Sequence, residues 1–236
     1  MNRKLTATLL ILAAVLANVG FSALGSLFNY PDVLDEPAGK VLAAFRDDQS
    51  AVSGWFSVLA LSAALLAPIA IGVGRLSSKR AMRIAVPVGI TAAAVQVIGL
   101  LRWPILVPGY ASDAASGNAG VAAAGRDSFT TASDILGTAV GETLGYLLTA
   151  TWTVLVIVAL GRRYAGRWFQ MLGAVSAVLV LVGVLSPLGL PVIDTANFLG
   201  YVLWSAWLIA LAVVILVHER RRSTSLTSTS PTGVRT

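Results

Sequence analysis

Six long apolar runs dominate the sequence, and each is long enough to cross a lipid bilayer, because a membrane-spanning helix needs roughly 20 consecutive apolar residues. The runs are continuously apolar instead of alternating with polar residues, which excludes a β-barrel. We expect spans at about Leu5–Leu27, Ala51–Val73, Ile84–Leu106, Ile135–Leu160, Trp168–Leu188 and Phe198–Val217. The pattern therefore predicts an all-α fold, a polytopic membrane helix bundle of about six transmembrane helices.

Composition agrees with that class. The chain is 56% hydrophobic and only 12% charged, with a mean hydropathy of +0.81, far above the values of water-soluble domains. The first apolar run also resembles a signal peptide, with Val15-Leu16-Ala17 as a passable cleavage site. Because the run continues to Leu27, which is long enough to span, we favour a retained helix; cleavage would leave five helices.

Charge predicts the orientation of the bundle. Thirteen of the 17 Lys and Arg residues flank one set of helix ends or lie in the C-terminal tail, whereas most acidic residues fall at the opposite ends. The positive-inside rule therefore places both termini in the cytoplasm of a bacterial cell, with the protein in the plasma membrane. The basic clusters should contact anionic lipid headgroups at the cytoplasmic face. Because they are split among short juxtamembrane segments, no nucleic-acid partner is expected.

The predicted domains are a six-helix transmembrane domain over residues 1–219 and a disordered basic, Ser/Thr-rich cytoplasmic tail over residues 220–236. Two outer loops are long. The first contains a short amphipathic helix whose apolar side chains Val41, Leu42, Ala44 and Phe45 should lie on the membrane surface. In the second, a helix leading into the fourth span is expected.

Two opposite charges fall at nearly the same predicted depth. Arg102 is 19 residues from the basic flank at Arg83, and Glu142 is 19 residues from the inner flank at Gly161. At 1.5 Å per residue each lies about 28 Å along its helix, near the outer edge of the hydrocarbon core. Because an unpaired charge in a membrane is costly, we expect Arg102 to pair with Glu142. Pro104 should kink or end the helix just beyond Arg102.

Three interpretations of the two charges stay open. They form a buried ion pair that fixes helix register, or they are the polar floor of an outward-open pocket, or Arg102 extends to the headgroups without contacting Glu142. For the pocket, the candidate lining residues at similar depth are Trp55, Gln96, Tyr146, Asp194, Asn197 and Tyr201. Aromatic residues near helix ends also serve as interfacial anchors, Asn197 also suits a helix cap, and Asp194 also suits a solvated loop.

Small residues recur every four positions beside Glu142: Gly137, Gly141, Gly145 and Thr149. Such a ridge lets another helix backbone approach closely. We call these four residues the glycine ridge.

The sequence gives little support for a metal site, a bound cofactor or an enzyme. The chain has no cysteine and one histidine, His218, so thiolate ligands and a haem with two axial histidines are unavailable. No cofactor and no metal site are predicted. No nucleophile–base arrangement falls within a predicted span, so an enzyme is the least favoured class and no catalytic residue is assigned.

The order NYPDVL–EPAGKVLAAF–W, LRWPILVPG, GETLGYLLTATWTV and NFLGYVLWSAW resembles an uncharacterised bacterial integral-membrane family, domain of unknown function 4386. The resemblance covers nearly the whole chain up to the tail, with LRWP and GE-LGY as its most specific pieces. It implies a compact multi-helix membrane domain and carries no activity, ligand or catalytic residue. Many members of that family have a histidine-bearing loop before the GE-LGY segment; here SFTTASDILG has none, which weakens a metal site further.

Two functional hypotheses follow. The first is a membrane protein that binds or moves a small amphipathic or lipid-like molecule, with Arg102 and Glu142 orienting its polar head. The second is a non-enzymatic interaction or structural subunit that packs through the glycine ridge against a partner or a second copy in a homo-oligomer. The second hypothesis requires the ridge to face lipid in the monomer.

Overall fold

The computed structural model describes residues 2–227, and within that range the chain is helical, with no strand. Within residues 2–227, six helical stretches are long and apolar enough to cross a membrane by length and composition. The fold is therefore an all-α, multi-pass membrane helix bundle, as the sequence predicts.

The six spans contain the long helices α1 Arg3–Phe28, α3 Gln49–Gly74, α4 Arg80–Ile105, α7 Gly145–Leu160, α8 Arg162–Val182 and α9 Pro191–Thr227. The shorter elements are the 3₁₀ helices η1 Asp32–Asp35 and η3 Gly183–Leu188, the helices α2 Ala38–Asp47, α5 Val107–Ala114 and α6 Ala119–Ala132, and the π-helix η2 Ser133–Leu144. The path of α6, η2 and α7 is continuous, so one span runs from Ala119 to Leu160.

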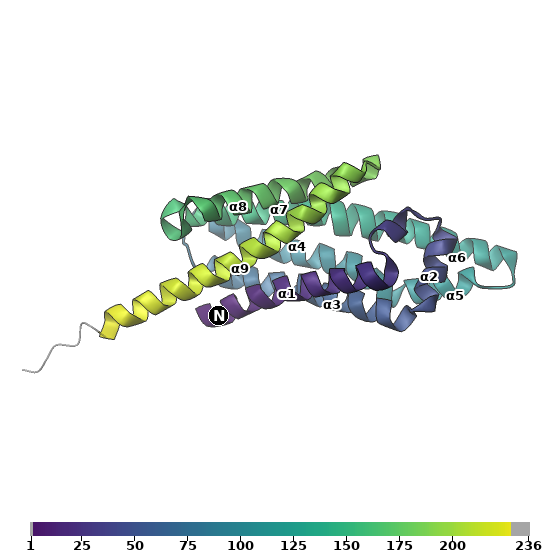
Figure 1. Cartoon of the computed structure of the whole chain (residues 1–236), viewed down its shortest axis with the longest axis horizontal. Helices are drawn as coiled ribbons and strands as arrows, with labels where there is room; N and C mark the ends of the chain where they lie inside the picture. Colours follow the sequence, from purple (N-terminus) through teal and green to yellow (C-terminus); the bar gives the residue numbers. More distant parts are fainter. Residues whose placement is uncertain (1, 228–236) are drawn as a thin grey trace, which may run out of the picture.

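The long helices form a ring in the order α1, α3, α4, α7, α8 and α9, and α9 packs back on α1. The chain runs up and down, so that the start of α1, the end of α9 and the α3–α4 and α7–α8 links lie at one end (Figure 1). Because Arg75, Arg80 and Arg162 lie at these links, we call this the basic end. The links are short: at the α7–α8 link, Gly161 adopts a positive φ of 70° that favours glycine.

Nearer the basic end, the ring is filled by large apolar side chains. Trp152, Trp207 and Phe169 are almost fully buried, with Trp152 and Trp207 in edge-to-face contact at 5.8 Å between ring centroids. Aromatic pairs of this kind stabilise a core by about 0.5–1.5 kcal/mol beyond the burial of their area.

A second core lies at the other end of the bundle, the cap end, around Trp103 of α4. Its ring stacks on Phe56 at 4.6 Å, and Phe28, Phe45 and Phe129 surround it. Trp103 is fully buried, so the predicted end of the helix near Pro104 lies beside a packed aromatic core. Helix α4 ends at Ile105, one residue beyond that proline, as expected.

The amphipathic helix α2 is not on the membrane surface. Val41, Leu42 and Phe45 are no more than 1% exposed and belong to the core around Trp103, with α2 packed on α5 and α6. The expectation of surface binding is wrong because an apolar helix face can be covered by lipid or by protein, and here α5 and α6 cover it.

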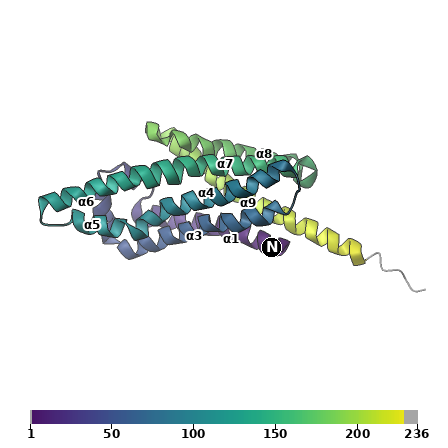
Figure 2. The ribbon, with the colours of Figure 1, turned by 180° about the vertical axis from the view of Figure 1, so that it is seen from behind.

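The long segment between the third and fourth spans is a helical hairpin. Helices α5 and α6 pack closely, since a Cβ added at Gly125 would meet the backbone nitrogen of Ala114 at 2.7 Å. The hairpin projects beyond the other helices at the cap end (Figure 2). At the opposite terminus, α9 continues to Thr227, so the tail predicted from residue 220 begins within a helix; residues 228–236 lie outside the described range.

Candidate functional site

Arg102 is buried in the cap-end half of α4, with 6% of its surface exposed. Its Nη1 donates a hydrogen bond to the carbonyl oxygen of Gly99, one turn earlier, at 2.6 Å. Its Cζ lies 5.4 Å from the centroid of the Trp103 ring. Its Nε is buried and has no hydrogen-bond partner. The guanidinium is therefore enclosed but only partly satisfied by the protein.

Gly137 of η2 makes the room for this guanidinium. A Cβ at position 137 would lie 2.7 Å from Nη2 and 2.8 Å from Cζ of Arg102. Real Cβ atoms do not approach other atoms so closely, so any side chain at position 137 would displace Arg102. The observed position of the Arg102 guanidinium therefore depends on the absence of a side chain at position 137.

Glu142 lies near Arg102, but within residues 2–227 the two side chains form no ion pair with nitrogen and oxygen within 4.0 Å. They interact electrostatically at longer range, and Asp194 at the start of α9 also acts on Glu142. Gly141, the residue before Glu142, is the one that meets α4, since its backbone contacts Gly99. Glu142 is therefore attached to η2 next to the contact between Gly99 and Gly141. It does not form the predicted direct ion pair with Arg102.

Three tyrosines gather around the two charges. The rings of Tyr146 and Tyr201 are in contact, with centroids 5.7 Å apart, and Tyr30, just after α1, is close enough to act electrostatically on both Arg102 and Tyr146. We call Tyr30, Arg102, Glu142, Tyr146 and Tyr201 the charge–tyrosine cluster. It combines a cation, an anion and three hydroxyl groups from α1's end, α4, η2, α7 and α9.

Tyr30 is the member of the cluster that the sequence analysis missed. Burial and the Glu142 carboxylate raise the pKa of Tyr30 to about 12, although the Arg102 guanidinium acts to lower it. Its hydroxyl therefore stays protonated at neutral pH and can donate a hydrogen bond. The signal for it was the NYPDVL motif, whose tyrosine stands directly after an apolar run that ends in a helix C-cap at Asn29.

The glycine ridge faces α4 of the same chain. Gly141 contacts Gly99, Gly145 lies against the Gln96 side chain, and Thr149 accepts a hydrogen bond from Gln96 Nε2 at 2.8 Å. One turn further, Trp204 Nε1 donates to the Thr153 hydroxyl at 2.8 Å. The ridge is thus a close intramolecular helix contact. It is not exposed to lipid, which contradicts the requirement of the interaction-subunit hypothesis.

The remaining residues predicted to line the pocket fall into two groups: those at or beside the cluster, and those with contacts elsewhere. Trp55 packs on the core around Trp103 and not in the cluster. Asn197 is buried and its Nδ2 donates to the carbonyl oxygen of Val180 on α8 at 2.9 Å, so it links α8 to α9. Asp194 is exposed in the first turn of α9, on the side of Glu142. Gln96, Tyr146 and Tyr201 therefore lie at or beside the cluster, and Trp55 and Asn197 have structural contacts elsewhere.

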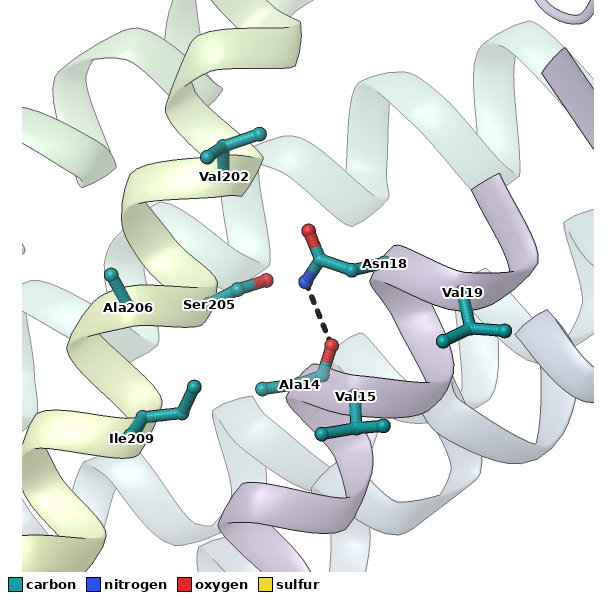
Figure 3. Close-up of a pocket in the computed structure, with 8 residues that line it drawn as sticks. All are labelled: Ala14, Val15, Asn18, Val19, Val202, Ser205, Ala206 and Ile209. Atoms are coloured by element: carbon teal, nitrogen blue, oxygen red, sulfur yellow. Dashed lines mark hydrogen bonds between the residues drawn. The ribbon is translucent and has the colours of Figure 1, made fainter. Parts of the chain in front are cut away.

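An open cleft of about 400 Å³ lies between α1 and α9. Figure 3 shows its walls: Ala14, Asn18 and Val19 come from α1, and Val202, Ser205 and Ile209 come from α9. The amide of Asn18 donates to the carbonyl oxygen of Ala14 at 2.7 Å. A second hollow, of about 480 Å³, lies between the end of α4, the α5–α6 hairpin and η2.

In the part of the chain that the structure describes, no three His, Asp or Glu side chains are grouped so as to hold a metal ion. The site is a set of opposite charges and hydroxyl groups in a helix bundle, in which Arg102 is buried and the other four cluster residues are half-buried.

These features define a multi-pass α-helical membrane protein with a polar site in its cap-end half. The chain belongs to the family described as Domain of unknown function (DUF4386), whose model matches residues 5–212. No curated protein and no solved structure matches it.

Proposed function

We propose that the protein binds, and moves within the membrane, a small amphipathic or lipid-like molecule whose polar head occupies the charge–tyrosine cluster. The observation that carries the proposal is the state of Arg102, which is buried with an unpartnered Nε and without a direct ion pair. Burying an incompletely paired charge costs several kcal/mol, less near the membrane interface. A bound anionic group would provide the missing partner.

The composition of the cluster favours a head that carries charge and hydrogen-bonding groups. Arg102 suits a phosphate or carboxylate, because guanidinium groups bind such oxygens through paired N–H donors. Glu142 suits an ammonium or hydroxyl group, and the tyrosine hydroxyls at Tyr30, Tyr146 and Tyr201 can donate or accept. Ionisable residues inside a membrane protein are by default candidates for substrate recognition.

The proposal places the cluster in the outer leaflet. Its support is the distribution of charge, since the basic end carries most of the Lys and Arg residues and should face the cytoplasm of a bacterial plasma membrane. At that end, the basic side chains would contact anionic lipid headgroups. Both termini would then be cytoplasmic.

Lipid binding to Arg102→Gln tests the proposal. The probe is phosphatidylethanolamine added to the detergent-solubilised protein, with affinity read by native mass spectrometry. We expect Arg102→Gln to weaken binding by about tenfold or more, which corresponds to about 1.4 kcal/mol. Arg126→Gln is the matched control, because Arg126 is the basic residue of α6 in the hairpin and lies outside the cluster.

Equal affinities of the unchanged protein, Arg102→Gln and Arg126→Gln for the lipid would overturn the proposal. Loss of binding in both variants would show a general charge effect and would overturn it as well. The thermal stability of each variant in detergent shows whether the fold is retained.

A further inference from the structure

We infer that the cleft between α1 and α9 is the lateral entrance of this site and holds an acyl chain of the bound lipid. The inference rests on the proposed function and adds the route and the class of ligand. The ligand is a membrane lipid whose tail lies between α1 and α9 and whose head reaches the charge–tyrosine cluster.

The depth of the cleft identifies its occupant. Asn18 is 15 residues from Arg3 and Ser205 is 15 residues from Arg220, so each lies about 22 Å along its helix from the basic end at 1.5 Å per residue. Because the hydrocarbon core is about 30 Å thick, this depth is inside it. Acyl chains are what a bilayer presents at that depth.

The cleft is open and its walls are mostly apolar, with valine and alanine side chains on both sides and an isoleucine on α9. Its volume of about 400 Å³ lies within the range of roughly 300–1,000 Å³ that ligand sites occupy. Helix α9 runs obliquely across the bundle, and its first turns diverge from the end of α1 (Figure 1). The two helices are therefore farther apart near the cap end, where the cluster lies (Figure 1).

The cleft and the cluster are joined through α9. Tyr201 belongs to the cluster, and the next residue, Val202, lines the cleft, with Ser205 one turn away. On α1, Phe21 is two residues beyond the cleft residue Val19, and its ring stacks on Tyr30 at 6.1 Å between centroids. The inference places the head of a lipid in the cleft beside Tyr201 and Tyr30, which are both half-buried.

Two polar side chains interrupt the apolar walls. Asn18 and Ser205 point toward one another across the cleft (Figure 3). Asn18 uses its amide nitrogen to bond Ala14, which leaves its carbonyl oxygen, and the Ser205 hydroxyl has no hydrogen-bond partner among residues 2–227. In hydrocarbon such groups favour a polar partner, and a lipid provides ester groups between head and tails.

The test uses phosphatidylethanolamine with a photoreactive diazirine, in vesicles that contain the full chain. In one probe the diazirine is in the middle of an acyl chain, and in the other it is on the headgroup. We expect the acyl probe to label residues 14–19 and 202–209, and the headgroup probe to label peptides that contain Tyr30 or Glu142. Excess unlabelled lipid should suppress both, because a specific site saturates and general contact with lipid does not.

A blocked cleft provides the second readout. The chain contains no cysteine, so Val202→Cys can be modified alone with a bulky maleimide. Val213→Cys is the matched control, since Val202 and Val213 are 40% and 50% exposed on the same helix. We expect modification at position 202 to reduce headgroup labelling of the cluster by about tenfold and modification at position 213 to leave it unchanged.

Equal effects at the two positions, or acyl labelling spread evenly over the lipid-facing helices, would overturn the inference. If headgroup labelling at the cluster and its dependence on Arg102 persisted in that case, the proposed function would stand and only the route would be wrong. If Arg102→Gln left headgroup labelling unchanged, the proposed function would fail first.

Discussion

At the scale of single residues, Arg102 is the most informative side chain. Its position near the end of an apolar segment predicted its depth in the membrane and its need for polar partners. In the structure Arg102 is buried. The partner predicted from the sequence was wrong, because Glu142 forms no direct ion pair with Arg102. Helical spacing specifies depth and face, whereas the direction of a long side chain depends on local packing, here the Gly99 carbonyl and the space at Gly137.

The first prediction concerns the coupling of the two charges. Because Arg102 is buried and incompletely paired, we expect Arg102→Gln to leave the free energy of unfolding unchanged or to raise it. Because Arg102 and Glu142 form no direct ion pair, we expect the effects of Arg102→Gln and Glu142→Gln to be nearly additive. Thermal unfolding of both single variants and the double variant in detergent measures this. A loss of about 3–5 kcal/mol in the single variants that the double variant recovers would identify a structural pair instead.

The second prediction concerns Gly137. Gly137→Ala places a methyl group where the Arg102 guanidinium lies, so Arg102 must move. We expect lipid binding to weaken by about tenfold, as for Arg102→Gln, while the helices remain assembled.

Gly54→Ala is the control for that change. The added Cβ at position 54 in α3 meets no atom within 4 Å beyond its chain neighbours and the nearby backbone of its own helix. Gly54→Ala should therefore leave binding unchanged and stabilise the helix by up to about 1 kcal/mol. Unchanged lipid affinity in Gly137→Ala would show that the observed position of Arg102 is not needed for binding.

At the scale of elements, the π-helix η2 is the feature that periodicity could not reveal. The four-residue spacing of the glycine ridge correctly predicts a close helix contact, and Gly99 and Gly141 form it. It does not distinguish contact with α4 from contact with another chain. It also cannot show the wider winding over Ser133–Leu144, since a π-helix is defined by i→i+5 hydrogen bonds and not by a residue spacing; such segments are frequent at functional sites.

The third prediction follows from this contact. A Cβ at Gly99 would lie 2.7 Å from Cα of Gly141, so Gly99→Ala must separate α4 from η2. Because backbone atoms cannot move aside as a flexible side chain can, we expect a destabilisation of about 1–3 kcal/mol. The thermal midpoint in detergent checks this against Gly54→Ala. A midpoint equal to that of the unchanged protein would mean that the two helices are less closely packed than described.

At the scale of the whole molecule, the sequence predicted most of the fold, because six apolar runs in a bilayer allow few arrangements. All six predicted runs fall within helices that can span. The cap end was harder to predict. Helix α2 and the α5–α6 hairpin have mixed composition, and their burial depends on one another and on Trp103.

The fourth prediction concerns orientation. Ala115 is exposed near the tip of the α5–α6 hairpin, and Ser78 is exposed in the α3–α4 link at the basic end. In intact bacterial cells, a membrane-impermeant maleimide should react with Ala115→Cys and not with Ser78→Cys. The reverse pattern would place the basic end outside and would move the charge–tyrosine cluster to the inner leaflet.

The α5–α6 hairpin also has a practical consequence. The span from Ala119 to Leu160 is 42 residues long, about 63 Å at 1.5 Å per residue, whereas a whole bilayer with its headgroups is about 40–45 Å thick. The hairpin must therefore stand clear of the membrane. Because the other helices are mostly surrounded by lipid, the hairpin is the most accessible epitope for an antibody fragment. Such a fragment would serve as a rigid fiducial marker for electron microscopy of this small protein.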